Sequence, residues 1–279
     1  MSTMTAILFP GQGSQTAEMR AAVERTRPEL LELVTAAVGQ DPFPRVGEGT
    51  NFAQPAIFTA SLAGWCALGS PQGDYMAGHS LGELGALVAA GALSESDGLA
   101  LVTLRGRLMS EAEAKAGQGG MVVVMGAGAS ERAPEVALAH HLVIANDNSP
   151  QQVVLSGARA ALPGAVRHAK DLGLRAMELD VTGAFHSPMM APAVPAFVAA
   201  LADTAFREPA VPVISAVTAQ PFTDPRRELA DALIRPVRWR ETMVALQDLG
   251  VSRFVEVGPG RVLTGLAKRT LRDVELVNG

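Results

Sequence analysis

Apolar positions along the chain form short runs that suit strands and longer periodic stretches that suit helices. The first run, Ala6 to Phe9, predicts a buried strand that stops at Pro10 and a glycine-rich turn. A helix is expected from about Thr16, followed by a loop over 41–49. Residues Pro55 to Leu68 have the length and period of a helix, with Pro55 placed in its first turn, where a missing N–H is tolerated.

The next apolar stretch combines both patterns around a serine. A short strand ends in MAGHS at residues 76–80, and LGELGALVAAGAL at residues 81–93 has helix-forming content. Ser94 is a candidate cap for a second helix that runs to about Ala114, because Asp97 follows it by three residues. Strand, glycine-flanked serine and helix are therefore expected in direct succession.

Between Gly120 and Val181 the pattern changes to short β-rich runs around a helix candidate at 158–173. Such runs predict a small α+β subdomain inserted into a larger domain. The expected division is a catalytic domain of residues 1–119 and 182–279 and an inserted subdomain of residues 120–181. The later elements expected are a helix at 189–204, a strand at 211–217, helices on either side of Pro236, a strand at 253–258 and a last helix from Arg261.

Composition and charge narrow the choice of partners. Of 279 residues, 48% are hydrophobic and 18% charged, so a large core is available. The net charge of −5 argues against nucleic acid as a partner. Residues 226–279 carry ten basic against seven acidic side chains. This basic end is a candidate site for an acidic partner or a phosphate, and a solvated face of mixed charge is the alternative.

Cysteine usage and hydropathy bear on location. The single cysteine, Cys66, cannot form an internal disulfide and fits a reducing compartment. The apolar run near the N-terminus is too short for a signal peptide, and no long apolar span predicts a membrane helix. We therefore expect a cytoplasmic protein without a membrane partner.

The candidate chemistry centres on Ser80. A serine hydroxyl becomes a nucleophile when a base removes its proton and donors stabilise the oxyanion. Gly78 and Gly82 permit a sharp turn that projects Ser80 from the end of a strand, and the N–H of Leu81 then points to where an oxyanion forms. A tight turn without chemistry is the alternative, because 28 residues of this chain are glycine.

A base is needed, and the chain offers five histidines. His79 adjoins Ser80, so its side chain is expected to diverge from the serine and to support the site. His186 lies just before a proline-broken helix, where the chain re-enters the large domain, and is the best candidate. Asp180 is expected in a strand, so the sequence favours a Ser–His dyad oriented by a backbone carbonyl over a triad. The other histidines are expected at the surface of the insertion: His140, His141 and His168.

A series of motifs follows one order along the whole chain. The motifs are FPGQGSQ (9–15), QPAIFTAS (54–61), GHSLGELGALVAAGAL (78–93), RGRLM (105–109), NDNSPQQVVLSG (146–157), GAFHSPMM (183–190), PVRW (236–239) and EVGPGRVLTGLAKR (256–269). The series resembles the malonyl-CoA:acyl carrier protein transacylases of fatty acid synthesis and the acyltransferase domains of polyketide synthases. The resemblance implies an α/β-hydrolase-like large domain with a parallel sheet core and an inserted ferredoxin-like α+β subdomain.

The resemblance also implies roles for individual residues. Ser80 matches the acylated serine of the family and His186 its base. Gln12 matches the residue whose backbone N–H completes the oxyanion hole with that of Leu81. Arg105, which follows the serine by twenty-five positions, matches the arginine that pairs with the free carboxylate of the malonyl group. A planar guanidinium suits this role because it grips a carboxylate through two parallel hydrogen bonds.

Other positions bear on the acyl group and on the base. Leu81 and Phe185 resemble the malonyl-selecting members, in which the aromatic ring would narrow the space beside the acyl α-carbon. We expect Phe185, together with Arg105 and His79, to line the substrate-binding site. Ala232 stands where the family often has glutamine, and the backbone carbonyl that mainly orients the histidine is retained by alanine.

The activity implied is a ping-pong transfer of a malonyl group from malonyl-CoA, through an acyl-serine, to the phosphopantetheine thiol of an acyl carrier protein. It would serve fatty acid or polyketide biosynthesis, and the sequence GAFHS slightly favours polyketide biosynthesis. The resemblance implies no cofactor, no metal and a monomer. One alternative is an editing hydrolase on the same scaffold, against which Arg105 argues, because monocarboxylic acyl chains need no anion clamp. The other is a non-catalytic scaffold that binds carrier protein.

Overall fold

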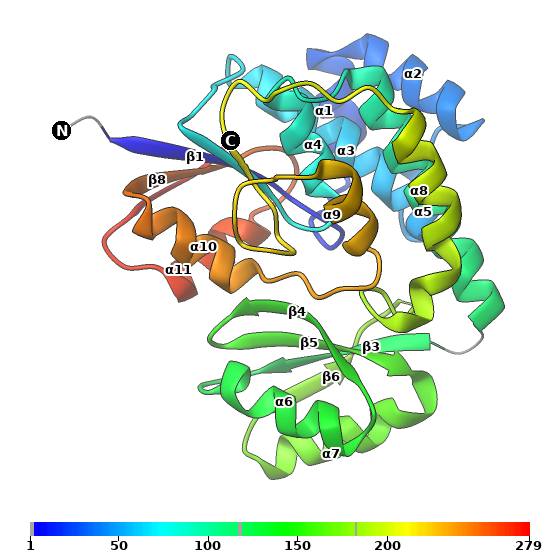
Figure 1. Cartoon of the computed structure of the whole chain (residues 1–279), viewed down its shortest axis with the longest axis vertical. Coiled ribbons are helices and arrows are strands. Elements are labelled where there is room, and N and C mark those ends of the chain that lie inside the picture. The colour runs from blue at the N-terminus through cyan, green and yellow to red at the C-terminus, as the bar shows by residue number, and fades with distance from the viewer. Residues whose placement is uncertain (1–2, 117–118, 182) are drawn as a thin grey trace.

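The computed structural model describes residues 3–116, 119–181 and 183–279, so the expected boundary at residue 182 falls outside the described residues. Within these ranges the strands form a five-stranded parallel sheet of order β7-β2-β1-β8-β9 and a four-stranded antiparallel sheet of order β4-β5-β3-β6 (Figure 1). The strands are β1 (Met4–Phe9), β2 (Tyr75–Gly78), β3 (Gly119–Met125), β4 (Val143–Ser149), β5 (Gln152–Ala158), β6 (Arg175–Glu178), β7 (Val213–Ile214), β8 (Val251–Glu256) and β9 (Glu275–Asn278).

Helices surround the parallel sheet and cover one side of the antiparallel one (Figure 1). In the described part of the chain, none of them combines the length and the apolar character needed to cross a membrane. The helices are α1 (Met19–Thr26), α2 (Pro28–Val38), α3 (Thr50–Ala67), α4 (Gly82–Ala89), α5 (Glu95–Ala116), α6 (Ala129–Ala139), α7 (Leu162–Asp171), α8 (Val194–Asp203), α9 (Pro225–Asp231), α10 (Trp239–Asp248) and α11 (Val262–Thr270).

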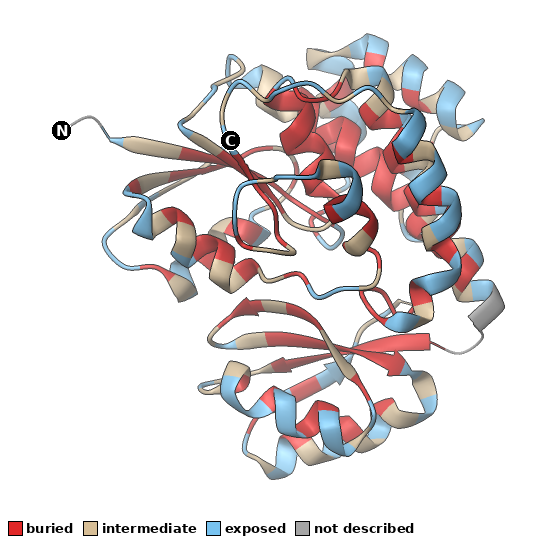
Figure 2. Cartoon of the chain, in the orientation of Figure 1, coloured by how far each residue is buried: buried red, intermediate tan, exposed pale blue. Residues whose placement is uncertain are grey.

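The parallel sheet is buried on both faces, and alternate side chains of β1 show how. Ile7 and Phe9 belong to the core that α3, α4 and α5 share. Ala6 and Leu8 belong to a second core on the other face, formed with α10 and α11. Because successive strand residues point to opposite faces, an uninterrupted apolar run is what a sheet between two helix layers requires. Figure 2 shows this buried centre between the more exposed helix surfaces.

The insertion follows the order β3-α6-β4-β5-α7-β6, which is that of a ferredoxin-like unit. Val122 and Val124 of β3 face a core closed by α6 and α7. Met121 and Val123, on the opposite face of the same strand, join the main core of the large domain. The expected fold, a parallel-sheet domain with an inserted α+β subdomain, is confirmed, and the insertion packs against the large domain through its open sheet face.

Several local predictions were wrong. Pro55 lies inside α3, because the helix begins at Thr50 and tolerates one missing backbone hydrogen bond. The strand expected at 211–217 is reduced to Val213–Ile214, since the Ser215 N–H bonds to the Gln220 carbonyl in a turn. Helix α6 and the short edge strand β9 were not expected, because α6 carries a proline and β9 is only partly buried.

The capping of α5 by Ser94 is confirmed, with the Asp97 N–H donating to its Oγ at 3.0 Å.

Candidate active site

The turn between β2 and α4 holds Ser80 in a backbone conformation that few residues adopt. Its φ of 55° lies in the left-handed region. A Cβ on Gly78 would lie 2.0 Å from the backbone carbon of Gly82, and a Cβ on Gly82 would lie 2.2 Å from the Phe9 oxygen. The turn therefore requires glycine on both sides of the serine, and such strained turns cluster at functional sites.

The structure brings His186 to this serine from the segment that follows the insertion. The Nε2 atom of His186 lies 2.9 Å from the Oγ atom of Ser80, and its Nδ1 atom lies 2.8 Å from the carbonyl oxygen of Ala232. A carbonyl oxygen only accepts hydrogen bonds, so Nδ1 carries the proton and Nε2 is left to accept one. The pair is a Ser–His dyad whose tautomer is set by a backbone carbonyl, the arrangement expected from the sequence.

Burial keeps this imidazole neutral. His186 is 5% exposed, and desolvation, reinforced by the positive charge of Arg105 and by His79, lowers its pKa to about 3. At neutral pH the ring is therefore ready to take a proton. A carboxylate that neutralises Arg105 would raise the pKa of His186 and make it a stronger base.

The guanidinium of Arg105 lies beside the dyad, although it comes from the middle of α5. It is 3% exposed, donates from one nitrogen to the Gln54 side-chain oxygen at 2.7 Å and from another to the Ser80 Oγ at 3.1 Å. Burial lowers its pKa to about 10, so it remains charged at neutral pH. Both hydrogen-bond partners are neutral. A buried cation held by neutral partners can pair with an anion placed close to the serine, and this role of Arg105 stays a prediction.

The carboxyl group of Glu83 is the acidic group whose charge acts on Arg105. It is 1% exposed and accepts the Ala216 N–H at 2.7 Å. Burial raises its pKa to about 8, so at neutral pH it is mostly protonated and leaves the guanidinium charge largely uncompensated. Glu83 had no predicted role, although a lone charge in the apolar helix α4 is a visible signal in the sequence.

The N–H groups of Gln12 and Leu81 are placed by the loop after β1 and by the start of α4. A Cβ on Gly11 would lie 2.5 Å from the His79 oxygen, so only glycine lets this loop approach the serine turn. Among the described residues, no group accepts a hydrogen bond from either N–H. Thr50 Oγ1 donates to the Gln12 side-chain oxygen at 3.0 Å and accepts from Gln54 at 2.8 Å, which links this loop to the residue that holds Arg105.

Residues 7–278 match the family described as acyl transferase domain. The chain belongs to the acyl transferase family. It is 38% identical to the malonyl CoA-acyl carrier protein transacylase of Synechocystis sp., over 98% of this chain and 96% of that protein. It is 39% identical to the polyketide biosynthesis protein ThaF of Burkholderia thailandensis, over 96% of this chain, which spans only 24% of that longer protein.

Solved structures of acyl transferases have the same fold. FabD from Acinetobacter baumannii superposes with a TM-score of 0.90 at 35% identity, over 100% of this chain and 94% of that one. The malonyl-transacylase PlMCAT, solved in complex with the type II PKS acyl-carrier protein AntF, superposes with a TM-score of 0.89 at 34% identity, over 99% of this chain and 96% of that one.

The remaining histidines of this acyl transferase lie as expected relative to the serine. His79 turns away from Ser80, and its Nε2 donates to the Asn148 side-chain oxygen at 2.8 Å, because the Asn148 amide nitrogen donates to Gln152. The ring of His79 meets Trp239 edge-on at 5.4 Å. The three histidines of the insertion lie outside the site, with one exposed and two partly buried, namely His141, His140 and His168.

Phe185 is buried in the main core, and its ring lies against Gly183, where a Cβ would be 2.4 Å from a ring carbon. Its role beside the acyl group stays a prediction. Gln54 and Asn148 lie within motifs of the resemblance but had no predicted role, because a hydrogen bond to a distant side chain has no local sequence signal. The structure thus adds Gln54 behind Arg105 and Asn148 behind His79.

Proposed function

We propose that this acyl transferase moves a malonyl group from malonyl-CoA to the phosphopantetheine thiol of an acyl carrier protein, in fatty acid or polyketide biosynthesis. The observation that carries the proposal is the buried guanidinium of Arg105, 3.1 Å from the Ser80 Oγ. An acyl group whose carbonyl reaches the serine can place a second, free carboxylate on this cation only when it is a short dicarboxylate. The names of the relatives of similar length support the same donor.

In the first half of the reaction, the Nε2 of His186 takes the proton from Ser80 as Oγ attacks the thioester carbonyl. The N–H groups of Gln12 and Leu81 stabilise the oxyanion of the tetrahedral intermediate. As the carbon–sulfur bond breaks, the CoA sulfur takes the proton from His186 and leaves, and the malonyl group remains on Ser80 as an ester. The carboxylate on Arg105 holds the acyl group in register throughout.

In the second half, the phosphopantetheine thiol gives its proton to His186 and attacks the ester carbonyl. The intermediate collapses, Ser80 recovers its proton from His186, and the malonyl thioester leaves on the carrier. The solved complex of PlMCAT with a carrier protein supports this acceptor. Water at the ester carbonyl would instead release malonate, which is the outcome that an editing hydrolase would favour.

The test uses malonyl-CoA labelled in the malonyl group, followed by a holo acyl carrier protein. Transfer is supported if label appears on Ser80 and then moves to the carrier. Rapid release of free malonate would identify a hydrolase, and no label on the protein would identify a non-catalytic scaffold. Ser80→Ala is the control, since it removes the acyl acceptor and is expected to take up no label.

A further inference from the structure

An edge strand of the insertion is joined to the segment that leads from Ala232 to α10. Val237 pairs in parallel with Asn146 of β4. The Asp147 N–H donates to the Val237 carbonyl at 2.9 Å, and the Val237 N–H donates to the Ala145 carbonyl at 2.8 Å. The large domain thus extends the antiparallel sheet along its β4 edge, and the insertion is held by backbone hydrogen bonds as well as by apolar packing.

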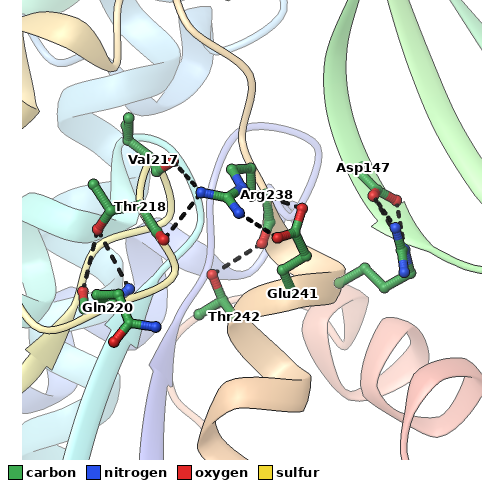
Figure 3. A network of polar contacts seen from close by, with 8 residues as sticks. Asp147, Val217, Thr218, Gln220, Arg238, Glu241 and Thr242 are labelled. Carbon is green, nitrogen blue, oxygen red and sulfur yellow. Dashed lines mark hydrogen bonds and ion pairs between the residues drawn. The ribbon is translucent and has the colours of Figure 1, made fainter. Parts of the chain in front are cut away.

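An ion pair closes the same junction. The guanidinium of Arg240, in the first turn of α10, donates to both carboxylate oxygens of Asp147, with N–O distances of 3.0, 3.0 and 2.7 Å. Figure 3 labels Asp147 and marks its contacts with dashed lines. The two side chains are 35% and 17% exposed. A two-point, partly buried contact of this kind fixes orientation better than an exposed pair does. We call these two residues the Asp147–Arg240 latch.

Both partners of the latch have neighbours that contact His79, the residue directly before Ser80. Asn148 follows Asp147 and accepts the hydrogen bond from His79, the residue directly before Ser80. Trp239 precedes Arg240, is fully buried and packs edge-on against the ring of His79. His79 is therefore held from two sides, by one neighbour of each latch residue.

The base is tied to the same junction. The carbonyl that sets the tautomer of His186 belongs to Ala232, five residues before the backbone bridge at Val237. Arg105 is fixed differently, because Gln54 of α3 holds its guanidinium and α5 carries it. The junction with the insertion therefore bears on the serine and the base, whereas the anion receptor is anchored elsewhere.

We propose that Asp147 and Arg240 are positioning residues for the Ser80–His186 dyad. By fixing β4 to the start of α10, the latch sets the place of His79 beside the nucleophile and of the Ala232 carbonyl beside the base. The malonyl readout rests on the proposed function, but the positioning itself concerns the dyad and not the identity of the acyl group.

The experiment measures how fast Ser80 reacts in single turnovers with two reagents. One is malonyl-CoA, and the other is a fluorophosphonate, which needs the dyad but no malonyl group. The variants are Asp147→Asn, Arg240→Lys and the double variant Asp147→Asn/Arg240→Gln. The matched control is Glu241→Gln, which removes the neighbouring ion pair of α10 with Arg238, a pair within the large domain (Figure 3). Thermal unfolding of each variant shows that it is folded at the assay temperature.

We expect Asp147→Asn to slow both reactions about tenfold, well within the hundredfold that a misplacement near 1 Å can cause. The malonyl-CoA concentration at half-saturation should change less than about twofold, as for a distant surface change. The rates of Arg240→Lys should lie between those of Asp147→Asn and of the native protein. The double variant should react as slowly as Asp147→Asn, because both variants remove the same contact.

Unchanged rates in a folded Asp147→Asn protein, an equal loss in Glu241→Gln, or a loss in binding alone would overturn the inference. The two proposals fail separately. If the native protein reacts with the fluorophosphonate and not with malonyl-CoA, the proposed function fails, and the latch is still judged by the fluorophosphonate rates.

Discussion

The Nε2 atom of His186 lies 2.9 Å from the Oγ atom of Ser80, although 106 positions separate the two residues in the chain. Both have a φ near 55°, so both side chains of the dyad leave the backbone from left-handed conformations. Within the described residues, no carboxylate bonds to the imidazole, and the carbonyl of Ala232 takes that place. The site therefore depends on the backbone geometry of Ser80, His186 and Ala232. This dependence predicts how substitutions and pH change its reactivity and stability.

The backbone of Ser80 should be strained in the native protein. A non-glycine residue held in the left-handed region is destabilised by about 1 kcal/mol or more, and glycine is not. We expect Ser80→Gly to be about 1 kcal/mol more stable than Ser80→Ala in urea unfolding, while both lose acylation by at least about a thousandfold. Equal stability of the two variants would show that the turn is not strained at this residue.

The pH dependence of Ser80 labelling should report the charge of Arg105. The reaction needs a neutral His186, whose pKa burial and Arg105 lower to about 3, so the native rate should persist to pH values well below 6. Arg105→Ala removes the positive charge, so the pKa of His186 should rise and the acidic limb of the fluorophosphonate profile should move to higher pH. Arg107→Ala, an exposed arginine on the same helix, is the control and should leave the profile in place.

Selectivity for a dicarboxylate should depend on the same guanidinium. Arg105→Ala should raise the malonyl-CoA concentration at half-saturation about 10- to 100-fold, the range for losing charge-assisted hydrogen bonds, and should increase acetyl transfer relative to malonyl transfer. Arg105→Lys keeps the charge but not the two-point contact, so its preference for malonyl transfer should lie between those of the native protein and Arg105→Ala. Competition between labelled acetyl-CoA and malonyl-CoA measures the ratio, and unchanged malonyl kinetics in Arg105→Ala would contradict the anion receptor.

Glu83 should make the native protein less stable as the pH rises. Its folded pKa of about 8 lies above the usual 4.5 of a glutamate, so the folded state holds a proton that the unfolded state has released, and stability falls between pH 4.5 and 8. Below pH 6.5 the neutral His186 and His79 act in the opposite direction, so Glu83 is followed from pH 6.5 to 8. Over it we expect the free energy of unfolding to fall by about 2 kcal/mol.

We expect Glu83→Gln to remove this dependence of stability on pH. The amide oxygen can still accept the Ala216 N–H, so the variant keeps the hydrogen bond and loses the titration. Urea unfolding at several pH values should therefore give a flat profile for Glu83→Gln where the native profile slopes. A slope of the same size in both proteins would assign the effect to another group.

Local sequence patterns predicted much of the fold. The apolar run at Ala6–Phe9 and the glycine-flanked Ser80 were predicted correctly, because strand burial and a sharp turn leave signals within a few residues. Pro55 was misplaced and α6 was missed, since tertiary packing extended one helix upstream of a proline and formed another from a stretch with weak periodicity. The insertion was recognised from its β-rich runs, but its face toward the large domain was not.

By itself, the sequence determined the strand–serine–helix turn, the inserted subdomain and, through its motifs, the family to which the chain belongs. Only the tertiary structure decided that Arg105 is buried against Gln54, that Glu83 is buried near it, and that Asp147 of the insertion meets Arg240 of the large domain. The reason is physical. A turn is set by the backbone limits of its own residues, whereas burial of a charge and its hydrogen-bond partners depend on which distant segments pack around it.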